Sequence, residues 1–110
     1  MARIRITVLH RELYQDLVDA YGSDGMRERG LPRCQTFRDG QTFEINGPLV
    51  CPEGFCSWAW ADLQRDCAMM LFGPPTQWQA EPMIVCCTDG FRPVVFGIEH
   101  IPASREQGGN

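Results

Sequence analysis

Hydrophobic and polar residues alternate at the start of the chain and then change to a helical period. Ile4, Ile6 and Val8 alternate with polar residues, which is the period of a half-buried β-strand. Apolar residues then recur at helical spacing, so we expect an amphipathic helix over residues 10–21. Residues 22–32 contain three Gly and no apolar period, which predicts a mobile loop.

Three further segments of regular structure are predicted downstream. Residues 34–37 and 41–45 flank an Asp-Gly step, which favours two short strands joined by a tight turn. Residues 56–72 contain neither Gly nor Pro and are followed by Gly-Pro-Pro, so we expect the longest helix there. Residues 83–88 and 91–96 flank a second Asp-Gly pair, which predicts a C-terminal β-hairpin with a two-residue turn.

The order of these segments indicates the fold class. A strand, a helix, short strands, a second helix and a hairpin predict an α+β fold with a small mixed or antiparallel sheet and two helices. The chain has 110 residues, the size of one domain, to which we assign residues 1–102. Residues 103–110 are polar and Gly-containing, which predicts a disordered tail.

Composition and charge exclude several classes of protein. Ten basic residues, all of them Arg, and 14 acidic residues give a net charge of −4, which is not the pattern of a nucleic-acid-binding protein. No apolar run approaches the ~20 residues of a membrane span. The first residues lack the apolar stretch of a signal peptide, so we expect a cytoplasmic protein. Its six Cys are then expected to be mostly reduced thiols, with disulfides as the alternative.

Two of these thiols are candidates for chemistry. Cys56 lies in the first turn of the predicted 56–72 helix, where free N–H groups and the helix dipole stabilise a thiolate. In the predicted hairpin, Cys87 pairs with Arg92, and a neighbouring guanidinium also favours the thiolate. For both Cys, packing in the core is the competing interpretation.

The long helix is predicted to be amphipathic. At 100° per residue its apolar side chains form one core-facing stripe, made of Cys56, Trp60, Leu63, Cys67, Met70 and Leu71. Cys67 is therefore expected to be a buried structural thiol. Trp58 falls on the opposite side, where an exposed Trp marks a ligand surface or an interface unless the segment around Trp78 covers it. Asp62 and Asp66 are expected on a solvated face.

A metal site is the second chemical possibility. Cys51 and Cys56 have the spacing Cys-x4-Cys, which matches zinc-ribbon patterns poorly. A site for zinc or another soft transition metal requires Cys34, Cys56 and Cys87 to converge, with a His as a further ligand. We therefore predict no cofactor and keep this metal set as the alternative.

Two long motifs carry a resemblance to a known family. Residues 52–62, PEGFCSWAWAD, and residues 86–96, CCTDGFRPVVF, resemble an uncharacterised family of short prokaryotic proteins of about this length. The resemblance covers most of residues 1–100 and implies no activity. It implies that the family-type positions are Cys34, Cys56, Trp58, Trp60, Cys87, Asp89, Gly90 and Arg92.

Three functional hypotheses follow. In the first, a small enzyme acts on a small anionic molecule through a Cys thiolate, with Arg92 as the anion-binding group and a Trp as an aromatic wall. In the second, the protein binds a metal without catalysis; in the third, it is a partner-binding module with Trp58 at the interface, and an open strand edge favours a homo-oligomer. The site residues are Cys56, Cys87 and Arg92 for catalysis and Trp58, Trp60 and Asp89 for substrate binding. The first hypothesis requires Cys56 and Cys87 to open into one cavity.

Overall fold

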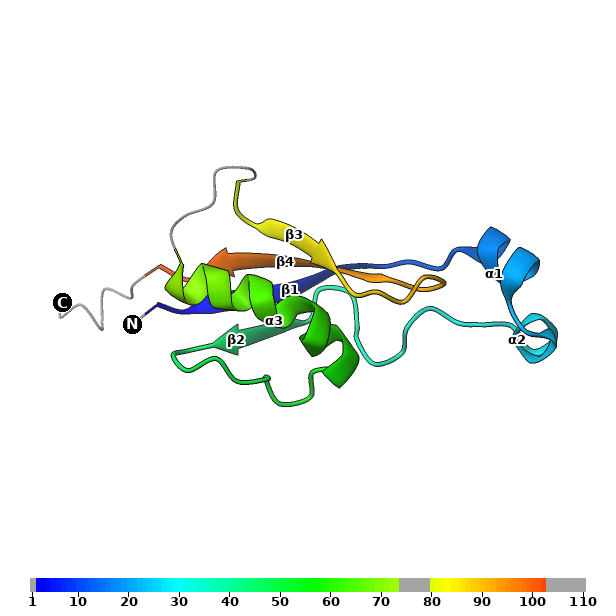
Figure 1. Cartoon of the computed structure of the whole chain (residues 1–110), viewed down its shortest axis with the longest axis horizontal. Coiled ribbons are helices and arrows are strands. Elements are labelled where there is room, and N and C mark those ends of the chain that lie inside the picture. The colour runs from blue at the N-terminus through cyan, green and yellow to red at the C-terminus, as the bar shows by residue number, and fades with distance from the viewer. Residues whose placement is uncertain (1, 74–79, 103–110) are drawn as a thin grey trace.

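The computed structural model describes residues 2–73 and 80–102 of the chain. Within these residues, an antiparallel sheet has the strand order β2-β1-β4-β3 (Figure 1). The elements are β1 (Ile4–Arg11), α1 (Gln15–Tyr21), α2 (Asp24–Arg29), β2 (Thr42–Ile45), α3 (Ser57–Phe72), β3 (Met83–Cys86) and β4 (Val94–His100). The α+β class, the antiparallel sheet and the C-terminal hairpin are confirmed. The predicted tail and Trp78 lie outside the described residues.

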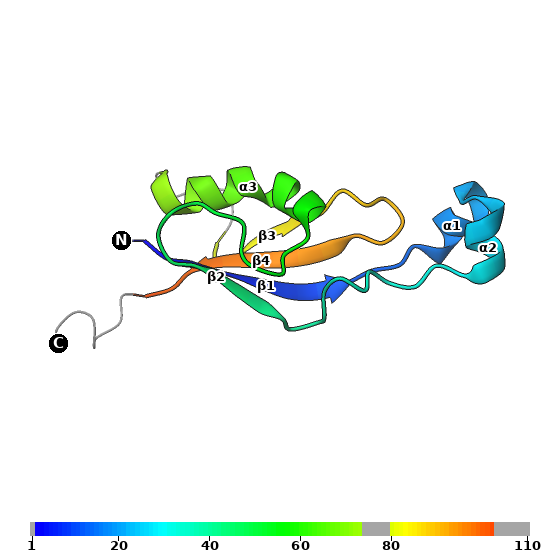
Figure 2. The same cartoon turned by 90° about the horizontal axis from the view of Figure 1, so that it is seen from below.

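Helix α3 packs across one face of the sheet and closes the hydrophobic core (Figure 2). In β1 the side chains of Ile4, Ile6 and Val8 are buried, as their alternation with polar residues predicts. On α3 the buried residues follow the predicted stripe and are Ala59, Leu63, Cys67, Met70 and Leu71. Although α3 has 16 residues, no helix in the described ranges combines the length and apolar character that crossing a membrane requires.

The predicted strand over residues 34–37 does not form. Phe37, which is 1% exposed, instead inserts its ring into the core, with its centroid 5.1 Å from that of Phe55 and 5.2 Å from that of Phe96. Burying such a ring contributes about 1.5–3 kcal/mol. Strand β2 obtains its backbone partners from β1, so the predicted pairing of residues 34–37 with residues 41–45 is wrong.

The predicted helix over residues 10–21 is shorter than expected. His10 and Arg11 continue β1 and pair with β4, and a β-bulge follows Val8. The N–H groups of Glu12 and Tyr14 then donate to carbonyl groups of the β3–β4 loop, at 2.9 and 2.8 Å. Because these hydrogen bonds keep the chain extended, α1 begins only at residue 15.

A third helix, α2, occupies the predicted mobile loop. The Ser23 side chain accepts a hydrogen bond from the Met26 N–H at 3.2 Å and caps the helix, and Asp24 lies in the first turn near Arg27. Gly30, with a φ of 79°, ends it. The prediction of a loop over residues 22–32 is wrong because these local caps replace an apolar stripe as the source of helix stability.

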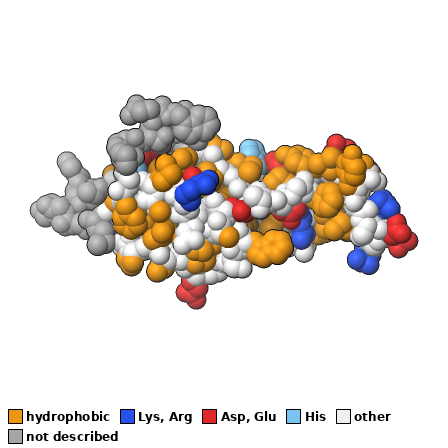
Figure 3. All heavy atoms as spheres, viewed as in Figure 1, with side chains coloured by type: hydrophobic (Ala, Val, Ile, Leu, Met, Phe, Trp, Pro, Cys, Tyr) orange, Lys and Arg blue, Asp and Glu red, His pale blue; other side chains and the backbone are white. Residues whose placement is uncertain are grey.

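Helices α1 and α2 project beyond the end of the sheet, and we call residues 12–33 the arm (Figures 1 and 2). Among the described elements, α1 and α2 contact each other and neither α3 nor any strand. The radius of gyration is 16.5 Å, whereas a compact domain of this length has about 13 Å. Apolar side chains are visible on the surface of the arm (Figure 3), and of its large apolar residues Tyr14 and Tyr21 are exposed, Tyr21 by 77%.

Candidate functional site

The β3–β4 connection differs from the predicted two-residue turn. Cys86 pairs with Val95, and the Cys87 N–H donates to the Val94 carbonyl at 3.1 Å, so residues 87–93 form a loop. The predicted pairing of Cys87 with Arg92 is therefore wrong. The register is shifted by two residues, so each strand residue keeps its predicted face.

Asp89 folds this loop. Its Oδ1 accepts hydrogen bonds from the N–H groups of Phe91 at 3.0 Å and Arg92 at 3.1 Å, which is an Asx-type turn. Its Oδ2 lies 3.3 Å from Nε of Arg92. A wide turn around the carboxylate therefore replaces the tight Asp-Gly turn, and it presents the Arg92 side chain at a fixed place.

One cavity of about 170 Å³ collects three thiols from separate parts of the chain. It lies between the start of α3, the segment around residues 34–37 and the β3–β4 loop. The thiols are those of Cys34, Cys56 and Cys87, and each is partly buried. Arg92 and Asp89 line the same cavity. Cys56 and Cys87 thus share one pocket, as the first hypothesis requires, and we call it the thiol pocket.

Cys87 is held at the end of β3 by both its backbone and its sulfur. Besides the backbone bond to Val94, its Sγ accepts a hydrogen bond from the Val94 N–H at 3.3 Å. A donor directed at sulfur stabilises negative charge there, as donors do for other anions. The Cys87 sulfur is thereby held at a defined place beside the β3–β4 loop.

Cys56 is the N-cap of α3, one position before the predicted first turn. Its carbonyl accepts the first helical hydrogen bond, from Trp60 N–H at 2.9 Å, and its side chain makes no capping hydrogen bond. The α3 dipole therefore points its positive end at this thiol. Burial raises the pKa of the nearby exposed Cys51, and the Cys56 thiol adds to that rise.

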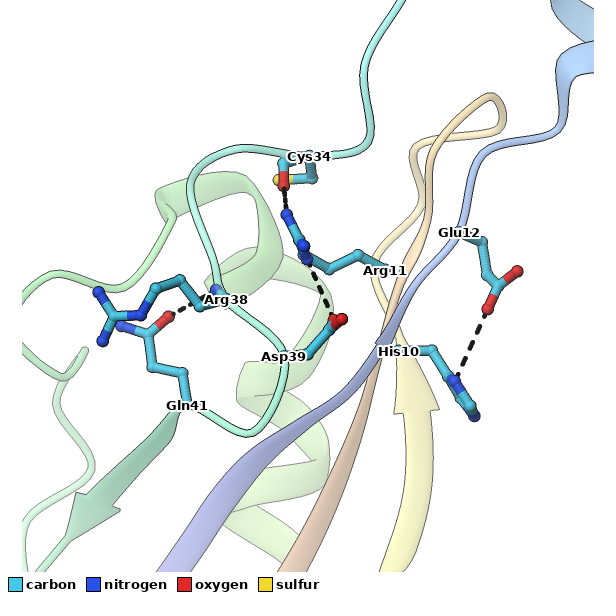
Figure 4. A network of polar contacts seen from close by, with 7 residues as sticks. All are labelled: His10, Arg11, Glu12, Cys34, Arg38, Asp39 and Gln41. Carbon is cyan, nitrogen blue, oxygen red and sulfur yellow. Dashed lines mark hydrogen bonds and ion pairs between the residues drawn. The ribbon is translucent and has the colours of Figure 1, made fainter.

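Cys34 lies outside regular structure and is placed by Arg11. Nη1 of Arg11 donates to the Cys34 carbonyl at 2.9 Å, and its Nε donates to Asp39 at 3.1 Å (Figure 4). One Arg of β1 thereby fixes both ends of the crossing segment that carries Phe37. Sequence reasoning gave Cys34 as a member of the alternative metal set and as a family-type position but not as a pocket residue of the first hypothesis, since this contact joins residues 23 positions apart.

The two Trp candidates, Trp58 and Trp60, lie in different environments. Trp58 lines the thiol pocket and is 82% exposed, so its ring forms an outer wall. Trp60 does not line that pocket; it is partly buried against the core, with its ring edge-on to Phe55 at 6.2 Å. Cys67 is fully buried, as predicted, and burial raises the pKa of its thiol to about 12.

Asp62 and Thr88 are among the pocket residues that sequence reasoning did not assign to the site. Asp62 accepts hydrogen bonds from the Thr88 N–H at 2.9 Å and from its hydroxyl at 3.0 Å. Asp62 lies on a partly exposed helix face, where it also has this partner, which the sequence did not indicate. Its position four residues after Trp58 places both on one helix face, which is the signal that was available.

The metal hypothesis gains no support from the described residues. Among residues 2–73 and 80–102, no group of three or more His, Cys, Asp and Glu side chains is arranged to hold a metal ion. The three pocket thiols therefore share a cavity without forming a ligand set.

Comparison with known proteins returned no match to this chain among family models, curated proteins or solved structures.

Proposed function

We propose that this protein binds a small anionic molecule in the thiol pocket and acts on it through a cysteine thiolate. The observation that carries the proposal is the convergence of Cys34, Cys56 and Cys87 on one small cavity that Arg92 also lines. Thiols used only for core packing, such as the fully buried Cys67, need no cavity.

The roles follow from the contacts. Cys87 is the nucleophile, since it lines the pocket and its sulfur accepts the Val94 N–H. Cys56, at the positive end of α3, is the second thiol and serves as acid or base. Arg92 gives its Nε to Asp89, and in the described part of the chain its terminal nitrogens have no ion pair or hydrogen bond, so they are available to an anion.

The ligand is small because the pocket holds about 170 Å³. The chemical step is attack of the thiolate on an electrophilic carbon of the bound acid. The sulfur lone pair forms the S–C bond, the leaving group departs with its bonding pair, and the thiol proton has already passed to Cys56 or to water. Reduced thiols of this kind suit the cytoplasm, where we place the protein.

Alkylation with a charged and a neutral reagent tests this proposal. The reduced protein is treated with iodoacetate or iodoacetamide, and the rate at each Cys is read by peptide mass spectrometry. The iodoacetate-to-iodoacetamide rate ratio at Cys87 is expected to exceed that at the exposed Cys86 about threefold or more. Arg92→Gln is expected to remove the difference at Cys87 and leave Cys86 unchanged.

Two results would contradict the proposal. Equal ratios at Cys87 and Cys86 would end the assignment of an anionic ligand. Pocket thiols that stay unreactive until the protein unfolds, as we expect of Cys67, would end the thiolate mechanism.

A partner-binding function is the second candidate, because Trp58 is 82% exposed. A large exposed aromatic ring is typical of a binding hot spot. If a second copy of the chain covers it, Trp58→Ala is expected to shift the protein towards a monomer in sedimentation velocity. The exposed Tyr21→Ala on the arm is the matched control. An unchanged sedimentation profile at high concentration would exclude Trp58 from such an interface.

A further inference from the structure

The Asp62–Thr88 contact joins α3 to the loop that carries the proposed nucleophile. Thr88 directly follows Cys87, and both Thr88 donors, the N–H and the hydroxyl, reach the same carboxylate at 2.9 and 3.0 Å. Hydrogen bonds to a carboxylate are roughly twice as strong as neutral ones. A side chain of the helix therefore fixes the backbone one residue away from the reactive sulfur.

Among the described residues, the other hydrogen bonds of this loop do not involve α3. Asp89 binds N–H groups and a side chain within the loop, and the loop carbonyls of Phe91 and Pro93 accept from the chain that follows β1. Among the described residues, Asp62 makes the side-chain hydrogen bonds between α3 and residues 87–93. Without the Asp62 side chain, the loop would keep its hydrogen bonds to the chain that follows β1 but lose those to α3.

Asp62 and Thr88 also lie at the boundary between two cavities. Both line the thiol pocket, and both line an open groove of about 600 Å³ between α3 and β3. Breaking their contact would join the pocket to this groove and admit more water to the partly buried Cys87. A pocket open to bulk water would weaken the attraction between Arg92 and an anion, because water screens charges.

We propose that Asp62, through Thr88, is the positioning residue that holds Cys87 and Arg92 in place at the thiol pocket. This inference rests on the proposed function, because it assigns Asp62 a role in the same anion-selective site. Asp62 itself touches Thr88 and acts on the sulfur through it.

The test uses the whole protein and the same two alkylating reagents. In Asp62→Ala, the rate of iodoacetamide at Cys87 is expected to rise at least threefold, towards that of the exposed Cys86, because the half-buried sulfur becomes accessible. The iodoacetate preference at Cys87 is expected to fall to that of Cys86. Cys56, on the helix side, is expected to keep its rate.

Matched variants separate positioning from general destabilisation. Asp66→Asn removes the same charge one helical turn later and is expected to behave as the wild type. Thr88→Ser keeps both donors and is expected to keep the wild-type alkylation rates. Thr88→Val keeps only the N–H, so its iodoacetamide rate at Cys87 is expected to lie between those of the wild type and Asp62→Ala. The fully buried Cys67 reports unfolding: it must stay unreactive in every variant compared.

Each outcome decides between the two proposals. An unchanged iodoacetamide rate at Cys87 in Asp62→Ala would overturn the role of Asp62, whatever the wild-type preference is. A wild-type protein without iodoacetate preference would overturn the proposed function. In that case a raised iodoacetamide rate at Cys87 alone would still support Asp62 as the residue that limits access to Cys87.

Discussion

Helices α1 and α3 both carry an apolar stripe, yet they end in different environments. Helix α3 spreads its stripe over the sheet and buries five side chains in the common core. Helix α1 lies on the arm and buries only Val18, which is fully covered but belongs to no part of that core. An apolar period thus reports that one side of a helix is covered, but not which surface covers it.

The two regions differ in how their stability arises. The core combines α3, all four strands and a cluster of aromatic rings. The arm depends on short-range devices, such as the Ser23 cap and the Arg27–Asp24 ion pair. Helices of six and seven residues are marginal when isolated. We therefore expect the arm to open locally while the core remains folded.

The largest expected effect separates core from arm directly. Leu63→Ala is expected to lower the free energy of unfolding by about 3 kcal/mol, because it leaves a cavity between α3 and the sheet. Val18→Ala also truncates a fully buried side chain but is expected to cost less than about 1 kcal/mol of global stability. Urea unfolding followed by circular dichroism measures both. Equal losses would mean that arm and core unfold as one unit.

A smaller effect is a dependence of stability on pH, which we expect in the core and not in the arm. His100, at the end of β4, places Nδ1 2.5 Å from the Glu81 carboxylate and Nε2 2.6 Å from the Met70 carbonyl of α3. Glu81 raises the pKa of His100 above its usual 6.5, and the Met70 carbonyl adds to this. The backbone N–H of His100 lowers the pKa of Glu81 below its usual 4.5. Both groups therefore favour the charged pair.

The sign of the pH dependence follows. The His100 contribution is complete below pH 6.5 and is lost as the pH rises through its raised, folded pKa. The Glu81 contribution is present above pH 4.5 and is lost as the pH falls through its lowered pKa. Stability of the core is thus expected to be highest between these values, by at most about 1 kcal/mol because the pair is half exposed.

Urea titrations across this pH range, repeated on His100→Gln, measure the contribution of the pair. His10→Gln is the matched control, since His10 is exposed on β1. We expect only His100→Gln to flatten the alkaline limb of the profile. Amide exchange on the arm should show no such dependence, and a parallel change there would join the two regions energetically.

Much of the pocket could be predicted from residue patterns. The sequence singles out Cys56, Cys87, Arg92, Asp89 and Trp58, because a helix start and a hairpin end are local features that periodicity locates, and all five line the pocket. The shift of the hairpin by two residues kept every strand side chain on its predicted face, so the wrong register did little harm.

Other pocket residues could not be predicted, because their places depend on partners far away in the chain. Cys34 is held by an Arg 23 positions earlier, and Asp62 reaches Thr88 across 26 positions. The Asp89 carboxylate decided the loop shape by binding three donors, which overrode the tight turn that Asp-Gly favours.

The amino-acid sequence by itself determined the α+β class, the first strand, the long helix with its buried face, and the existence of the hairpin. Only the tertiary structure decided that Phe37 enters the core, that α1 stands outside it, and that three thiols meet at one cavity. The physical reason is range: period and capping are set by neighbours within a few residues, whereas burial and side-chain partners depend on surfaces that form only when distant segments pack together.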